Sequence, residues 1–238
     1  MLLQLKMRKN KFAVLNFPGS NCEKDCHFVI EHVLKQNCKY IWHEETDINN
    51  VDCIIIPGGF SYGDYLRTGS IAAQSKIAKR LKKYSKQGGT IIGICNGFQI
   101  LTELKLLPGT LLRNRSLNFI CKEVNLVVNN KSRFTSKYDH NEVIKVPIAH
   151  AEGNYFANST IHKELIKNNQ IIFSYCDTEG NINDSSNPNG SLNGIAGITN
   201  KEGNVLGMMP HPERVSEKVF GNTQGLGVFE SILDFHRS

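Results

Sequence analysis

The stretch TIIGICNGFQILTEL, residues 90–104, constrains the fold of this 238-residue chain more than any other. Residues Thr90–Ile94 have the character of a buried strand, and they run directly into an apolar helix. Cys95 stands at the junction, with Gly93 two residues before it and Gly97 two residues after it. This spacing is typical of a sharp strand-to-helix turn that exposes its central side chain, since only glycine avoids a clash on either side. The stretch therefore predicts a strand–elbow–helix unit with a cysteine at its apex.

Strand and helix patterns alternate through the first 104 residues. Short apolar runs predict strands at Lys11–Phe17, Lys39–His43, Asp52–Ile56 and Thr90–Ile94. Helical periodicity predicts helices at Glu23–Gln36, Ile71–Ser85 and Gly97–Leu104. This alternation indicates parallel βαβ units, whose ligands bind at the carboxyl ends of the strands.

The pattern changes after Pro108. Further strands are predicted at Phe119–Val128, Glu142–Ala149, Gln170–Tyr175, Gly194–Thr199 and Val205–Met209, as an antiparallel or mixed extension of the sheet. Helices are predicted at Ser159–Lys167 and Gln224–His236, and a polar loop at Asp177–Asn193. No linker divides the chain, so we expect one domain over residues 11–238, preceded by a ragged or disordered extension over residues 1–10.

Composition excludes several classes of protein. The net charge is +6, but the densest basic cluster, Lys76–Lys86, has the spacing of a solvated helix face and no nucleic-acid-binding motif accompanies it. Seven scattered cysteines indicate reduced thiols and a cytoplasmic protein. Cys22 and Cys26 lack a second ligand pair at zinc spacing, so no metal site is expected. No apolar run reaches bilayer length, so we expect no membrane association.

The chemistry of the elbow depends on its position. A thiol at a helix N-terminus faces the positive end of the helix dipole and unpaired amides, which stabilise a thiolate. The backbone amide of Asn96 would point to where an oxyanion forms. Taken alone, the pentapeptide is equally consistent with a buried core cysteine beside a tight turn.

Two further motifs follow predicted strands. In MPHPE, residues 209–213, two prolines restrict the backbone around His211, and Glu213 could orient its ring as the third member of a Cys–His–Glu triad. In PGGF, residues 57–60, the amide of Gly59 or Phe60 could be a second oxyanion donor. By itself the first motif fits a surface turn better, and the second fits a strand-ending turn equally well. Together with the elbow they favour a nucleophilic site.

PGGF, GICNGFQ and HPE, in this order, resemble the motifs of the class I (triad) glutamine amidotransferases. The strings NFPGSNCEKD, PGGFSYGDYLRTGSIAA, LRNRSLNF, PIAHAEGNYF and MMPHPER are similar, more narrowly, to the glutaminase subunits that serve purine biosynthesis. The resemblance covers the chain from about Lys11 onward, and it departs at Ala151, where glycine is usual. It implies an α/β fold, a flavodoxin-like three-layer sandwich with a central mixed, mostly parallel sheet.

The resemblance also implies roles for individual residues. Cys95 would attack the side-chain amide of L-glutamine to form a thioester, His211 would transfer protons, and Glu213 would hold its ring. Gly59 and Asn96 would form the oxyanion hole. Glutamine-contacting positions are implied at Gln99, Phe60, Arg67 and Tyr62. His150 and Glu152 match a family string, but their role stays open.

The implied partners follow from what the chain lacks. Making an amidine from an amide consumes ATP, yet there is no GxxxxGK[ST] string here. The resemblance therefore implies no cofactor in this chain, with ATP and Mg on a synthetase subunit that converts formylglycinamide ribonucleotide to its amidine, and a small third subunit. The alternatives are a stand-alone γ-glutamyl hydrolase, a glutaminase subunit of another synthetase, and a scaffold without activity.

Overall fold

The computed structural model describes residues 9–236. Residues 1–8 of the expected N-terminal extension lie outside the described residues. The last residue of that segment, Asn10, is buried, and its backbone N–H donates a hydrogen bond to Oε1 of Gln36. The ordered chain therefore begins no later than Asn10.

A nine-stranded mixed sheet runs through the molecule in the order β2-β1-β3-β4-β11-β10-β9-β6-β7. Its strands are β1 (Lys11–Asn16), β2 (Asn37–Trp42), β3 (Cys53–Ile56), β4 (Thr90–Ile94), β6 (Ile120–Val128), β7 (Val143–His150), β9 (Ile171–Cys176), β10 (Ile195–Thr199) and β11 (Val205–Met208). The pairs from β2 to β11 are parallel, and the pairs from β11 to β7 are antiparallel. Strand β11 therefore joins the two halves of the sheet.

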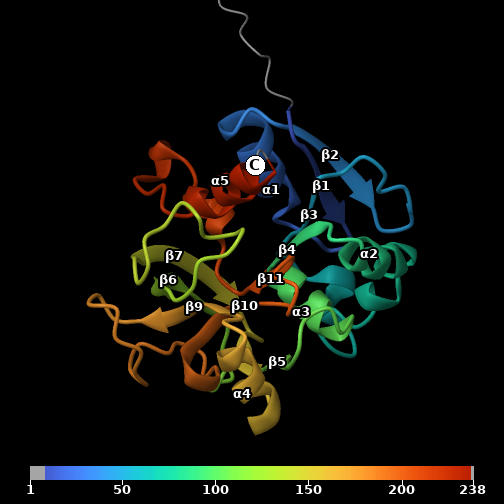
Figure 1. Cartoon of the computed structure of the whole chain (residues 1–238). Helices are drawn as coiled ribbons and strands as arrows, with labels where there is room; N and C mark the ends of the chain where they lie inside the picture. The colour runs from blue at the N-terminus through green and yellow to red at the C-terminus, as the bar shows by residue number, and fades with distance from the viewer. Residues whose placement is uncertain (1–8, 237–238) are drawn as a thin grey trace, which may run out of the picture.

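Helices cover the parallel half on both sides, namely α1 (Glu23–Phe28), α2 (Lys76–Lys86), α3 (Asn96–Glu103) and α5 (Leu226–Phe235). Helix α4 (Ser159–Lys167) directly precedes β9 and lies beside the antiparallel half (Figure 1). Figure 1 shows α1 and α5 on one side of the parallel strands and α2 and α3 on the other. The predicted α/β fold with a mixed central sheet is confirmed, with the parallel strands at its core. None of the helices within residues 9–236 is long and apolar enough to cross a bilayer.

Two predicted helices differ in detail from the observed ones. The helix expected over Glu23–Gln36 is α-helical only to Phe28 and continues as a π-helical turn over Val29–Val33. The helix expected from Ile71 begins instead at Lys76, because Ser75 has an extended backbone with ψ of 161°. A short 3-10 turn, Ala72–Gln74, precedes that break.

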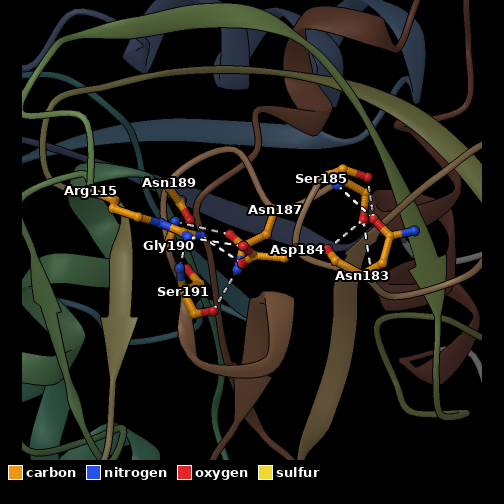
Figure 2. Close-up of polar contacts among 9 residues, drawn as sticks. Arg115, Asn183, Asp184, Ser185, Asn187, Asn189, Gly190 and Ser191 are labelled. Atoms are coloured by element: carbon orange, nitrogen blue, oxygen red, sulfur yellow. Dashed lines mark hydrogen bonds and ion pairs between the residues drawn. The ribbon is translucent and has the colours of Figure 1, made fainter.

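A small second sheet and the predicted polar loop lie outside the nine-stranded sheet. Strands β5 (Thr110–Leu112) and β8 (Asn154–Phe156) pair antiparallel, and at three residues each they are too short to show a periodic pattern. The predicted polar loop is irregular but well bonded (Figure 2). Arg115 forms two hydrogen bonds with the Asp184 carboxylate, at 2.9 and 3.2 Å. This pair ties the segment after β5 to the polar loop.

Candidate active site

The elbow predicted around Cys95 is present between β4 and α3. Cys95 adopts φ 51° and ψ −105°, a conformation rare for a residue with a side chain. A Cβ on Gly97 would lie 2.0 Å from the Ile56 carbonyl oxygen, and one on Gly93 would lie 2.5 Å from Cδ1 of Leu101. No larger side chain fits at either position. The two glycines thus allow the close packing that holds Cys95 in its turn.

The strand pairing brings His211 to the same edge of the sheet. Because β11 pairs with β4, the Cys95 N–H donates to the Met208 carbonyl at 2.8 Å, one residue beyond the ladder. The chain then leaves β11, and the His211 N–H donates to the Pro147 carbonyl at 2.8 Å. His211 is therefore fixed by its backbone to β7 as well as by its sequence position after β11.

The imidazole of His211 lies between Cys95 and Glu213. Its Nδ1 is 2.6 Å from Oε1 of Glu213, and the side chains are 2% and 0% exposed. A Cβ placed on Gly58 would lie 2.7 Å from Cε1 of His211 and 3.4 Å from Cβ of Cys95, so both residues pack against Gly58. The structure therefore brings together the sulfur, the imidazole and the carboxylate predicted from three distant motifs.

The electrostatics of the histidine suit proton transfer. Burial acts to lower the pKa of His211, but the Glu213 carboxylate and the nearby Cys95 and Cys22 sulfurs outweigh it and raise this pKa well above the ordinary 6.5. A buried imidazole paired with a carboxylate can accept a proton from a thiol and return it to a leaving group.

The oxyanion side of the site is built from backbone. The Gly58 carbonyl accepts hydrogen bonds from the N–H groups of Asn21 and Cys22, at 3.4 and 3.3 Å. Since a trans peptide holds its C=O and N–H on opposite sides, the N–H of Gly59 points away from the 19–22 segment. Phe60, the other donor considered, uses its N–H on the Gly19 carbonyl at 2.9 Å. Of the two amides, that of Phe60 is therefore the one bonded to the 19–22 segment.

The turn requires glycine at position 59. Gly59 has φ of 142°, and a Cβ there would lie 2.7 Å from the backbone nitrogen of Asn21. Asn96 is the first residue of α3, so the helix offers its N–H no internal partner. The Asn96 amide is thus held at the start of α3, directly after Cys95.

The four predicted glutamine-contacting positions separate into two groups. Gln99 donates through Nε2 to the Glu152 carbonyl at 2.7 Å and accepts from Nδ2 of Asn96 at 2.8 Å, so it lies beside the elbow. Phe60 is 45% exposed and packs toward Phe119. The other two, Tyr62 and Arg67, bond to side chains outside the triad.

Those two side chains have partners elsewhere. The Tyr62 hydroxyl is bonded to Nδ1 of His43 at 2.7 Å. The Arg67 guanidinium pairs with Glu103 at 2.9 Å, at the end of α3, and also bonds to Thr110. Sequence patterns alone carried no sign of these contacts.

Sequence reasoning missed or left open several groups near the elbow. The Cys95 thiol donates to the Ala149 carbonyl at 3.6 Å. His150 is buried, with Nδ1 bonded to Oδ1 of Asn114 at 3.0 Å, and burial together with the charge of His211 lowers its pKa to about 4. Burial and nearby Glu152 raise the pKa of Asp64 to about 6. The sequence signals for these groups were the two family strings that contain them, PIAHAEGNYF and PGGFSYGDYLRTGSIAA.

Within residues 9–236, one group of side chains has the composition of a metal site. Cys22, His211 and Glu213 place their ligand atoms within 4.8 Å of one another. However, Nη2 of Arg214 lies 3.2 Å from the Cys22 sulfur. This fixed positive charge disfavours a divalent cation at the same point.

Known proteins resemble this chain over nearly its whole length. The CobB/CobQ-like glutamine amidotransferase domain family matches residues 9–227. A phosphoribosylformylglycinamidine synthase subunit PurQ from Moorella thermoacetica is 50% identical over 226 residues, which cover 94% of this chain and 96% of the relative. The PurQ subunit from Koribacter versatilis is 52% identical over 224 residues, with 94% and 97% covered.

Solved structures agree with this similarity. PurLQS from Thermotoga maritima superimposes with a TM-score of 0.85 at 40% identity, covering 96% of this chain and 100% of that chain. A GMP synthase-type protein from Thermoplasma acidophilum has a TM-score of 0.60 at 14% identity, with 95% and 94% covered, and shares the fold alone.

Proposed function

Because this chain belongs to the CobB/CobQ-like glutamine amidotransferase family, we propose that it is the glutaminase subunit of a phosphoribosylformylglycinamidine synthase. It releases ammonia from L-glutamine and supplies it to a synthetase subunit that converts formylglycinamide ribonucleotide to formylglycinamidine ribonucleotide. The observation that carries this proposal is the meeting of Cys95, His211 and Glu213 around Gly58. Residues 11–238 act as a single amidotransferase domain.

The first half of the reaction makes a thioester. His211 takes the proton of the Cys95 thiol through Nε2, because Nδ1 is bonded to Glu213. The sulfur attacks the carboxamide carbon of glutamine, and the N–H groups of Gly59 and Asn96 stabilise the oxyanion that forms. His211 then gives its proton to the departing nitrogen, which leaves as ammonia.

The second half regenerates the thiol. His211 activates a water molecule that attacks the γ-glutamyl thioester, and the carbon–sulfur bond breaks to release glutamate. Glu213 stabilises the imidazolium in both halves and holds the ring in one orientation. Gln99 lies beside the elbow, where it can contact the bound glutamine.

Ammonia use requires a partner. The amidine-forming step consumes ATP, and we assign ATP and Mg to the synthetase subunit, which works with a small third subunit. Exposed apolar side chains beside the oxyanion turn support docking there: Phe60 is 45% exposed, Tyr65 74%, Leu66 94%, and Phe119 51%. Such a patch on one face is typical of an interaction surface.

If activity depends on docking, the isolated chain would waste little glutamine. The Gly58–Gly59 peptide is held by two long hydrogen bonds, so small movements of the 19–22 segment can reorient the Gly59 N–H. We expect the assembled complex to release glutamate faster than the isolated chain. Equal rates for the two would contradict this part of the proposal.

The decisive experiment combines this chain with its synthetase subunits and measures glutamate and amidine together. Cys95→Ala should abolish both products with glutamine, while added ammonium salt should still give amidine. A diazo-ketone analogue of glutamine should label Cys95 in the wild type. Glutamate formation by Cys95→Ala would overturn the proposal. Glutamate without any transfer to formylglycinamide ribonucleotide would favour a stand-alone γ-glutamyl hydrolase or a different synthetase.

A further inference from the structure

A second thiol lies behind the proposed triad. Cys22, directly before α1, is 1% exposed, and its Sγ is 3.9 Å from Nδ1 of His211, the nitrogen that faces Glu213. The same sulfur accepts a hydrogen bond from Nη2 of Arg214 at 3.2 Å, and the thiol donates to Oδ1 of Asn21 at 3.1 Å. The Cys22 sulfur therefore contacts both the Arg214 guanidinium and the His211 imidazole.

The contact leaves little free space around the ring. A Cβ on Gly58 would be 3.1 Å from the Cys22 sulfur and 2.7 Å from Cε1 of His211. The Cys22 backbone also holds the Gly58 carbonyl, through the hydrogen bond that orients the Gly59 amide. One residue thus touches both the imidazole and the turn that carries the oxyanion donor.

Arg214 is held from two sides. Besides the sulfur, its Nε lies 4.0 Å from Oδ2 of Asp25. Arg214 and Asp25 line a cavity of about 530 Å³, on whose wall Glu213 also lies. Oε2 of Glu213 is buried and has no hydrogen-bond partner among the described residues. One oxygen of the Glu213 carboxylate therefore lacks a hydrogen-bond donor, and the nearby Arg214 guanidinium supplies positive charge beside it.

We propose that Cys22 and Arg214 are positioning residues for His211. Cys22 keeps the ring from rotating away from Cys95, and Arg214 offsets the negative charge of Glu213, so that the imidazole gives up its proton within the working pH range. This inference rests on the proposed glutaminase function. The titratable and charged groups that face His211 are Glu213, Cys95, Cys22, Arg214, Asp25 and His150.

Sulfur suits this position better than the obvious alternatives. A thiol is large and polarisable and makes weak, adaptable hydrogen bonds, so it can pack on the imidazole while bonded to a guanidinium. A serine hydroxyl has a shorter reach and its hydrogen bonds are more directional. It would stay bonded to Asn21 and contact the His211 ring less closely. Alanine would leave a void beside Nδ1.

The test compares five variants in the chain assembled with its synthetase subunits, by kcat and KM for glutamate release across pH. Cys22→Ala should lower kcat about ten-fold while KM for glutamine changes less than about two-fold, since the ring loses its alignment. Cys22→Ser should lie between it and the wild type. Cys26→Ala, which removes a second buried thiol one turn further along in α1, is the packing control and should keep the wild-type kcat.

Arg214 provides the second arm. Arg214→Gln should shift the acid limb of the pH profile of kcat/KM to higher pH by about half a pH unit, because removing a positive charge favours protonated His211. Arg214→Lys should restore the limb. If Cys22→Ala matches Cys26→Ala in kcat and Arg214→Gln leaves the limb in place, the positioning role is wrong while the glutaminase function stands. If the wild-type complex releases no glutamate, the proposed function itself fails.

Should Cys22→Ala not fold, Cys22→Ser and the two Arg214 variants decide the question by the same measurements. Nitrogen NMR of the His211 ring gives a readout without substrate. At a pH above the pKa of His211, where the ring is neutral, the wild type should show a single tautomer with the proton on Nδ1, and Cys22→Ser a mixture of tautomers. A single unchanged tautomer in Cys22→Ser would count against the proposal.

Discussion

The elbow at residues 93–97 and the loop at residues 60–67 both contain non-glycine residues in left-handed conformations, yet they hold them by different means. Cys95, at φ 51°, is 5% exposed and enclosed by backbone. Tyr62, Asp64 and Leu66, at φ 55°, 55° and 67°, follow one another in a loop where Leu66 is 94% exposed. Strain of this kind persists only where surrounding structure over-determines it.

The difference concerns what each region is built to do. The elbow is fixed by packing within this chain, so its geometry exists before any partner arrives. The loop has few internal contacts for its apolar side chains, and its strained backbone directs them outward. We infer that the elbow supplies the chemistry and that the loop responds to whatever docks on it.

The largest expected contrast comes from adding one methyl group to each region. Gly97→Ala places a Cβ 2.0 Å from the Ile56 carbonyl and should destabilise the protein by more than about 3 kcal/mol. Gly63→Ala, at φ 68°, places a Cβ 2.9 Å from the movable ring of Tyr65 and should cost about 1 kcal/mol. Urea unfolding of both variants measures the difference. Equal losses would show that the two regions are equally rigid.

A second test uses two groups whose pKa values are shifted in opposite directions, His150 beside the elbow and Asp64 in the loop. The pKa of His150, beside the elbow, is lowered from 6.5 to about 4, so the unfolded chain binds the proton first and stability falls as pH drops below 6.5. Between pH 7.5 and pH 5 this loss should be about 2 kcal/mol, and His150→Asn, which keeps a donor for Asn114, should remove it.

Asp64 in the loop has the reverse sign. Its pKa is raised from 3.8 to about 6, so the folded chain binds the proton first and this group adds stability as pH falls through 6. Asp64→Asn should therefore steepen the acid loss of stability, by a smaller amount because the carboxyl is only half buried. Unfolding curves at the two pH values for both variants check the signs, and parallel slopes would contradict them.

The smallest effect separates strain from chemistry at the elbow itself. Cys95→Gly and Cys95→Ala both remove the thiol, but only alanine retains a Cβ at φ 51°. The glycine variant should be more stable than the alanine variant by about 1 kcal/mol, with both inactive. Thermal unfolding at one pH measures this. A more stable alanine variant would show that Cys95 is not strained.

The local part of the site could be predicted from sequence because it depends on neighbouring residues. The spacing of Gly93, Cys95 and Gly97 encodes the elbow directly, and buried apolar runs encode β3, β4 and β11. The meeting of Cys95 with His211 depends on β11 pairing with β4, and strand order is not visible in a periodic pattern. Because both motifs follow predicted strands, their meeting was a hypothesis that depended on one shared sheet, and the resemblance of the ordered motifs supported it.

The remaining contacts depend on long separations in the chain. Cys22 and Arg214 are 192 residues apart, and their hydrogen bond leaves no trace in either local pattern. Tyr62 and Arg67 belong to a loop motif that suggested a role at the pocket, but each finds a nearer partner in His43 and Glu103. Side-chain direction in an irregular loop is set by tertiary packing, which sequence spacing does not encode.

The pairing of β4 with β11 has a consequence for how such a chain can vary. Cys95 and His211, the proposed nucleophile and base, follow the ends of two paired strands, so the spacing of these strands in the sheet limits their separation. The connecting excursions, such as residues 177–193, can lengthen, shorten or change composition without moving either group. We therefore expect related chains to differ mainly in the length and composition of their surface loops, while the spacing of Cys95 and His211 stays constant.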